Sequence, residues 1–275
     1  MDNSRVVLQK LLSIDSGQAI TRRGFCEVGG PVIMAGDANV LCSPALLLGA
    51  YGFDADTDAP FVDVVRFEAP PCASLSVPAD VEARPWPTYP SGFLRSVGGE
   101  LTPVWELGWT RFSPGAEYWR VHADKPQELI TVYQGAAWGW QGALEWRPAS
   151  PLIGARANWQ GVECAADVKG GQVELTVFSQ PESNGWASQR PMTWSRTVPL
   201  AECDVFEKVV IASFSGVRIR VLEVRQGDAR IQLMGSDPES AARIGATMID
   251  QGVFENPRVA VGELSNMEVF VRQPV

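Results

Sequence analysis

The segment Val162–Val177, VECAADVKGGQVELTV, determines the fold predicted for the C-terminal half of the chain. On either side of its two glycines, apolar residues alternate with polar ones, which is typical of two antiparallel strands joined by a tight turn. Alternate side chains point to the same face of a strand, so we expect one apolar face to be buried. The segment therefore predicts a β-hairpin.

A second copy of this pattern begins 55 residues further along the chain. The first residues that align are Ala157, Trp159, Gly161 and Val162 with Ala212, Phe214, Gly216 and Val217. With small insertions the match continues to a Pro-Glu-Ser tripeptide that begins at Pro181 in one copy and at Pro238 in the other. Weak identity in a constant order indicates an old internal duplication.

The two copies define the predicted domain organisation. We predict a mainly β (α+β) protein, with an aromatic-rich α+β domain at 1-150 and two tandem duplicated small β-barrel repeats at 155-211 and 212-275. In its pattern of short strands each repeat resembles an SH3-like barrel. A shift of parity at Leu222 predicts a β-bulge in the second copy. The residues expected in the repeat cores are Val162, Val173, Leu175, Val217, Ile219, Ile231 and Leu233.

Outside the two hairpins, short sequence patterns predict further helices and strands. Three helices are predicted from their capping residues. Asn3 or Ser4 is expected to cap a helix that carries Val6–Leu12. Ser43 is expected to cap a helix that ends at Gly52, and Asp237 one that ends at Gly245. The strands predicted in the N-terminal domain are 29–36, 61–67, 117–123 and 128–135.

Composition and charge favour some classes of function over others. The chain has 275 residues, 45% hydrophobic and 20% charged, and a net charge of −9. It contains no apolar run of the roughly 18–20 residues that a membrane span needs, and its start lacks the basic and apolar blocks of a signal peptide. We therefore expect a cytoplasmic protein that does not bind membranes. The negative charge predicts no binding to nucleic acid and favours a basic protein or a cationic ligand.

Metal, cofactor and disulfide signals are weak. The five cysteines have no short spacing and His122 is the single histidine, so we predict reduced thiols and neither a metal nor a cofactor. The segment Asp54–Ala59, DADTDA, begins like an EF-hand loop. Ala59 and Val65 stand where that loop needs glycine and glutamate, so the segment is predicted to be a solvated turn.

The tryptophans are the unusual feature of the composition. All ten lie between Trp86 and Trp194. Trp138 and Trp140 have the spacing that places two side chains on one face of a strand. Such a cluster forms either a core or a binding patch, and both interpretations remain open. The candidate partner-binding residues are Trp105, Trp109, Trp138, Trp140, Trp146, Arg111 and Arg147.

Two hypotheses about function follow. The first is a non-enzymatic, cytoplasmic protein-binding protein, for example an immunity protein that neutralises a bacterial toxin, or an adaptor. The alternative is a small-molecule or glycan-binding protein or a hydrolase, with a site between the N-terminal domain and the repeats. Glu106 and Glu117 would then be the acid and base candidates, with His122 as a weaker one. The sequence contains no recognised catalytic motif and does not predict an oligomeric state.

Overall fold

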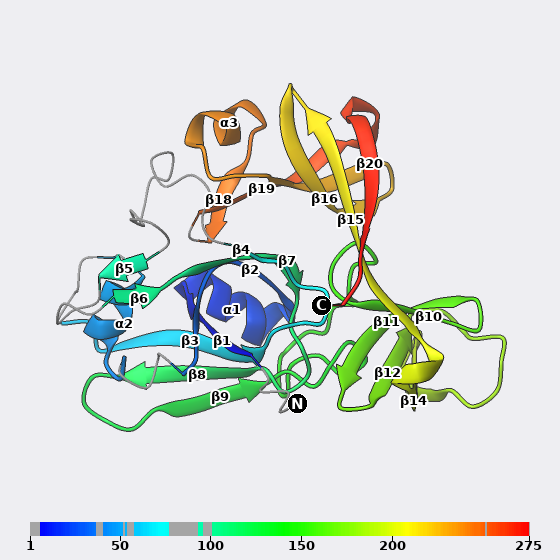
Figure 1. Cartoon of the computed structure of the whole chain (residues 1–275), viewed down its shortest axis with the longest axis horizontal. Coiled ribbons are helices and arrows are strands. Elements are labelled where there is room, and N and C mark those ends of the chain that lie inside the picture. Colours follow the sequence, from blue (N-terminus) through cyan, green and yellow to red (C-terminus); the bar gives the residue numbers. More distant parts are fainter. Residues whose placement is uncertain are drawn as a thin grey trace.

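The computed structural model describes residues 6–36, 41–51, 53, 58–76, 93–95, 101–250 and 252–274. The protein is mainly β and contains two large antiparallel sheets (Figure 1). The N-terminal sheet has seven strands and the C-terminal sheet has eleven. The residues Asp54–Thr57 of the predicted solvated turn lie outside the described part of the chain.

The N-terminal sheet has the strand order β4-β7-β2-β1-β3-β8-β9. Its strands are β1 (Val7–Leu12), β2 (Glu27–Met34), β3 (Phe61–Glu68), β4 (Leu75–Ser76), β7 (Trp105–Arg111), β8 (Glu117–His122) and β9 (Glu128–Val132). A separate small ribbon consists of β5 (Phe93–Arg95) and β6 (Leu101–Pro103). The strands predicted at 29–36, 61–67, 117–123 and 128–135 correspond to β2, β3, β8 and β9 and are confirmed.

The helix predicted near the N-terminus is wrong. Val7–Leu12 forms β1, which pairs with β2 on one side and β3 on the other, so pairing in the sheet outweighs the helical spacing of its apolar residues. The first helix, α1 (Ile14–Arg23), follows directly. Ser13 caps it by accepting a hydrogen bond from the backbone N–H of Ser16, and Gly24 ends it at φ 63°.

The other two predicted helices are confirmed. Ser43 caps α2 (Pro44–Ala50) and accepts a hydrogen bond from the N–H of Leu46. Asp237 caps α3 (Pro238–Arg243) by accepting hydrogen bonds from two backbone N–H groups of its first turn.

The C-terminal sheet repeats one scheme of pairing twice. Its strands are β10 (Arg156–Trp159), β11 (Val162–Lys169), β12 (Gln172–Val177), β13 (Ala187–Arg190), β14 (Thr193–Pro199), β15 (Asp204–Phe214), β16 (Val217–Arg225), β17 (Asp228–Leu233), β18 (Thr247–Asp250), β19 (Val253–Ala260) and β20 (Ser265–Arg272). In the first unit β10 pairs with β11 and β15, β11 with β12, and β14 with β12 and β13. In the second unit β15 pairs with β16 and β20, β16 with β17, and β19 with β17 and β18.

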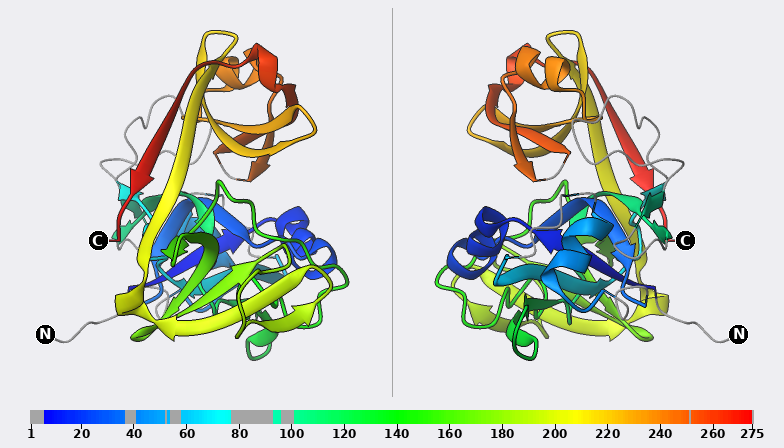
Figure 2. Two further views of the ribbon diagram at one scale, coloured as in Figure 1. Left: turned by 90° about the vertical axis from the view of Figure 1, so that its right-hand side faces the viewer. Right: turned by 90° about the vertical axis from the view of Figure 1, so that its left-hand side faces the viewer.

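Strand β15 belongs to both units. Its first residues pair with β10 and its later residues with β16 and β20, so it runs across the boundary predicted between 211 and 212 (Figure 2). Neither unit is a closed barrel, and the SH3-like barrel architecture is not confirmed. The strands β13 and β18 each pair with one neighbour among the described residues, which leaves both units with an open edge.

Six of the seven residues predicted for the repeat cores are buried. The exception is Val162, which is 41% exposed beside the turn at Gln160-Gly161. The bulge predicted at Leu222 is confirmed by a shift of register between Val221 and Glu223. The opposite face of β11 is also buried, because Ala165 and Asp167 pack against the N-terminal part of the chain.

All five cysteines are free, and Cys26, Cys72 and Cys164 are buried. Burial raises the pKa of the Cys26 thiol to about 11. Of the helices in the described part of the chain, none has the length and apolar character that crossing a membrane requires.

Candidate functional site

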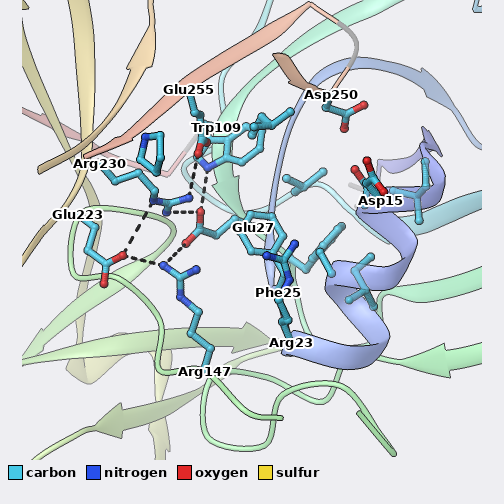
Figure 3. A pocket seen from close by; sticks show the side chains of 18 of the residues that line it. Asp15, Arg23, Phe25, Glu27, Trp109, Arg147, Glu223, Arg230, Asp250 and Glu255 are labelled. Atoms are coloured by element: carbon cyan, nitrogen blue, oxygen red, sulfur yellow. Dashed lines mark hydrogen bonds and ion pairs between the residues drawn. The ribbon is translucent and has the colours of Figure 1, made fainter. Parts of the chain in front are cut away.

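A cleft of about 830 Å³ lies between the N-terminal sheet and the second C-terminal unit. Helix α1, β2, β7 and the segment 145–148 form one side, and residues of β16, β17, β18 and β19 form the other (Figure 3). Trp109 and Phe25 contribute aromatic surface to the cleft, with their ring centroids 6.4 Å apart. This is the region in which the alternative hypothesis placed a site.

The position of Trp109 depends on a glycine in the neighbouring strand. A Cβ atom on Gly29 would lie 2.5 Å from Cε3 of Trp109 and 3.0 Å from its Cα, so only glycine leaves room for the indole at this position of β2. The indole Nε1 donates a hydrogen bond of 3.1 Å to Oε2 of Glu27, the first residue of β2. Glu27 thus enters the cleft next to an aromatic surface.

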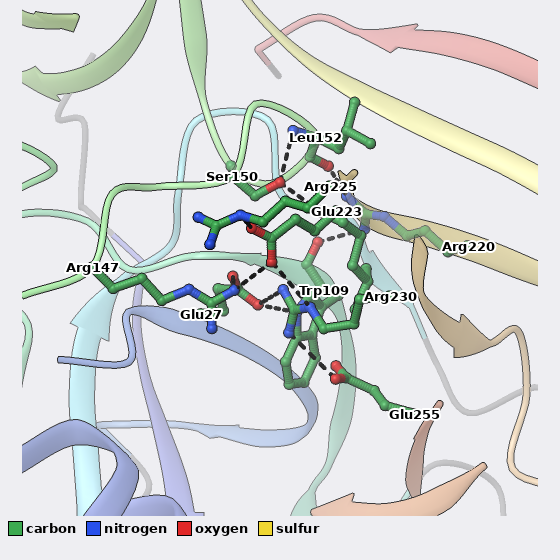
Figure 4. A network of polar contacts seen from close by, with 12 residues as sticks. Glu27, Trp109, Arg147, Ser150, Leu152, Arg220, Glu223, Arg225, Arg230 and Glu255 are labelled. Atoms are coloured by element: carbon green, nitrogen blue, oxygen red, sulfur yellow. Dashed lines mark hydrogen bonds and ion pairs between the residues drawn. The ribbon is translucent and has the colours of Figure 1, made fainter. Parts of the chain in front are cut away.

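Three carboxylates and three arginines form a network across the cleft (Figure 4). One of the arginines, the exposed Arg225, lies with its Nε 2.6 Å from Oε1 of Glu223. Arg230 on β17 donates from Nη2 to Glu27 and from Nη1 to Oε2 of Glu255 at 3.3 Å. Arg147 donates from Nη2 to Oε2 of Glu223 at 2.7 Å, and the same nitrogen lies 4.0 Å from Oε1 of Glu27. The network therefore joins the N-terminal sheet to the second unit.

Glu255 is the carboxylate of this network that has a buried oxygen without a hydrogen-bond partner among the described residues. Its side chain is 6% exposed, and the oxygen in question is Oε1. Burial raises the pKa of its carboxyl to about 7, Arg230 opposes this rise, and the negative charge of Glu27 adds to it. The carboxylate therefore titrates near neutral pH and has one oxygen free to accept a hydrogen bond.

The charged side chains that line the cleft nearly balance. Six carboxylates stand against five basic side chains, a difference of one negative charge. The six are Asp15, Glu27, Glu145, Glu223, Asp250 and Glu255, and the five are Lys10, Arg23, Arg147, Arg225 and Arg230. The buried Lys10 lies 3.2 Å from Asp250 at one end of the cleft. The sixth negative charge belongs to Glu255, whose pKa of about 7 leaves it only partly ionised at neutral pH, and a cation bound beside it would favour the ionised form.

Only three of the seven predicted partner-binding residues line the cleft: Trp109, Trp146 and Arg147. Trp105 is half-buried and packs against the core of the N-terminal sheet. Arg111 is buried and ion-paired with Asp167.

Trp138 and Trp140 do not share a face of a strand, and this expectation is corrected. Positive φ angles at Gly135 and Gly139, 115° and 72°, turn the chain at this point. Trp138 is 39% exposed, whereas Trp140 is 4% exposed and donates from Nε1 to the carbonyl of Phe25 at 2.8 Å. The predicted aromatic patch is thus divided between core, cleft and surface, and its role in binding stays a prediction.

The alternative catalytic residues Glu106, Glu117 and His122 lie away from the cleft. Glu106 is on β7, where it pairs in register with Pro31 of β2. Glu117 accepts a hydrogen bond of 2.8 Å from Nε1 of Trp119, and His122 lies 3.2 Å from Glu128. None of the three lines the cleft, so any chemistry there would need other carboxylates.

Glu27, Arg230 and Glu255 were not predicted as site residues. Arg230 alternates with the buried Ala229 and Ile231, so it lies on the face of β17 opposite the core of its own unit. The N-terminal sheet covers that side. The sequence marks these three residues only as charged residues in apolar strands. Such residues are too common to identify a binding site.

Comparisons of the chain with protein families, with curated proteins and with solved structures found no match. Within the described residues, no group of three or more His, Cys, Asp or Glu side chains is placed to hold a metal ion.

Proposed function

We propose that this chain is a non-enzymatic, cytoplasmic protein-binding protein, for example an immunity or adaptor protein, and that its cleft receives a positively charged side chain of a basic partner. The observation that carries the proposal is the Oε1 atom of Glu255, which is buried in the cleft wall without a hydrogen-bond partner among the described residues. A buried polar atom left unpaired costs about 1–3 kcal/mol, which a donor from a partner would recover.

An arginine side chain fits the chemistry of the cleft. Its planar guanidinium donates paired hydrogen bonds to carboxylates, and Glu255 offers one unused oxygen while Asp15 is an exposed carboxylate on the α1 side. The partly exposed ring of Phe25, which packs beside the buried Trp109, provides surface for the guanidinium and its apolar stem. The net charge of −9 would accelerate capture of a basic protein.

The architecture also suits a binding protein. The two C-terminal units have one scheme of strand pairing, and we propose that they descend from a single duplicated SH3-like unit. Duplication of a small binding module places a second surface beside the N-terminal domain, and the cleft lies where these two parts meet.

The test uses three forms of the full chain as bait in cell extracts: wild type, Glu255→Gln and the control Glu128→Gln. Glu128 has a side chain 54% exposed and lies outside the cleft. We expect a stoichiometric basic protein to be retained by wild type and by the control, and to be lost with Glu255→Gln. Retention of that protein by Glu255→Gln with unchanged affinity would contradict the use of this cleft.

A second candidate function is the binding of a small cationic molecule or an amino sugar in the same cleft. Its volume of about 830 Å³ lies within the roughly 300–1,000 Å³ of typical small-molecule sites. If the cleft binds such a molecule, calorimetric titration with arginine or glucosamine derivatives should give saturable binding to wild type and none to Glu255→Gln. The capture experiment should then retain no stoichiometric protein.

A further inference from the structure

Strand β20 forms the longest edge of the C-terminal sheet. It has eight residues and pairs with β15 on one side, and no strand of the described chain pairs with its other side. The other edge strands of the two large sheets, β4, β9, β13 and β18, have two, five, four and four residues. In both views of Figure 2, β20 (red) runs beside β15 (yellow).

The side chains of β20 are unusually apolar for an exposed edge. Met267, Val269, Phe270 and Val271 are 49%, 61%, 42% and 56% exposed. Proteins normally blunt such an edge with lysine, proline, a bulge or a short strand, because its free N–H and C=O groups pair readily with another strand. Between Met267 and Val271 the sequence carries only one charge, Glu268, so nothing in this stretch opposes pairing strongly.

We propose that β20 pairs antiparallel with β20 of a second copy of this chain, about a two-fold axis at Phe270. This register places Phe270 opposite Phe270, Val269 opposite Val271, and Glu268 opposite Arg272 twice. Opposite charges across an antiparallel pair stabilise it, and a two-fold interface requires a self-complementary sequence of this kind. A shift by one residue loses both charge pairs, because Glu268 then faces Val271 and Arg272 faces Met267.

Arg272 is available for this contact. Its side chain is 34% exposed, and its Nη1 lies 3.6 Å from Oε2 of the buried Glu207 without forming a hydrogen bond. Glu207 therefore holds one nitrogen of the guanidinium near the end of β20, and the 34% exposure of the side chain leaves part of it accessible to a second copy. The pairing joins the C-terminal sheets of two copies into one continuous antiparallel sheet.

The first test is the mass in solution, measured by sedimentation velocity over a range of concentrations. Wild type is expected to approach twice 29.9 kDa as concentration rises. Glu268→Arg, which sets arginine against Arg272 twice, is expected to weaken association about tenfold. The control Glu263→Arg makes the same charge change at an exposed position outside β20 and should associate like wild type. A wild type that stays at 29.9 kDa, or a Glu268→Arg variant that associates normally, overturns the proposal.

Cysteine cross-linking then tests the register, in a background where the exposed Cys42 is changed to serine. Directly opposed residues lie within disulfide range, so Phe270→Cys is expected to form a covalent dimer on mild oxidation. Two Val269→Cys chains should not cross-link, because this register separates the two cysteines diagonally by about 7–8 Å. A mixture of Val269→Cys and Val271→Cys chains should cross-link. Equal cross-linking of Val269→Cys and Phe270→Cys overturns the register.

Discussion

Oδ1 of Asp167 on β11 lies 3.0 Å from Nη2 of Arg111 on β7, and both side chains are 2% exposed. The other carboxylate oxygen accepts a hydrogen bond of 2.6 Å from the backbone N–H of Ala136. The same guanidinium nitrogen also donates to the carbonyl of Ala166 at 2.7 Å. A buried ion pair therefore joins the N-terminal sheet to the first C-terminal unit.

Asp167→Ala is expected to lower the free energy of unfolding by about 3–5 kcal/mol, because Arg111 then remains buried without its counter-charge. Urea denaturation followed by circular dichroism measures this loss. The control Asp228→Ala removes an exposed pair with Arg258, whose side chain is 80% exposed, and should cost less than about 1 kcal/mol. Equal losses in the two variants would show that the buried pair does not join the two parts as inferred.

The two neighbouring tryptophans Trp138 and Trp140 should respond differently to the same substitution. Trp140→Ala removes a ring that packs against Phe112 and Tyr133, and should cost about 3–5 kcal/mol of unfolding free energy. Trp138→Ala removes a side chain that is 39% exposed, so its cost should be well below half of that. Thermal unfolding of the two single variants compares them directly. Similar shifts of Tm would mean that Trp138 is more deeply packed than its exposure indicates.

Local sequence rules predicted the elements whose signals are complete within a few residues. Ser43-Pro44 and Asp237-Pro238 begin helices as expected, because a cap and a proline act over one turn. The alternation in Val162–Val177 gives the expected hairpin for the same reason. The helix predicted at Val7–Leu12 was wrong because this segment pairs with β2 and β3, which lie elsewhere in the sequence. Pairing with these strands outweighs the helical spacing of its apolar residues.

The candidate site was not predictable by these rules. Glu27 and Arg230 are in contact although 203 residues separate them, and no local pattern records such a contact. The duplicated strands indicated which face of each hairpin forms its own core. They did not indicate that the N-terminal part of the chain covers Asp167 on the opposite face of β11 and Arg230 on that of β17.

Gly29→Ala is expected to destabilise the protein by about 1–3 kcal/mol, because the added methyl group overlaps the backbone and ring of Trp109 in the adjacent strand. The displacement of the indole should also weaken any ligand bound in the cleft, measured by calorimetric titration. Gly36→Ala is the control, since no atom lies within 4 Å of the position of its added Cβ. A Gly29→Ala variant with the stability and affinity of wild type would contradict the close packing of β2 against β7.

Glu255 should make the stability of the protein depend on pH between its ordinary pKa, 4.5, and its pKa of about 7 in the folded chain. In this window the folded state keeps a proton that the unfolded state releases. The free energy of unfolding therefore falls as pH rises, by up to about 1.4 kcal/mol for each pH unit. Glu255→Gln has no such group, so its stability relative to wild type should increase from pH 4.5 to 7 and then level off. Glu239→Gln, at a side chain 85% exposed, should show no such trend. Urea unfolding at a series of pH values measures the stability of each variant relative to wild type. A difference between Glu255→Gln and wild type that does not change with pH would mean that the Glu255 carboxylate of wild type is as well compensated in the folded cleft as in water.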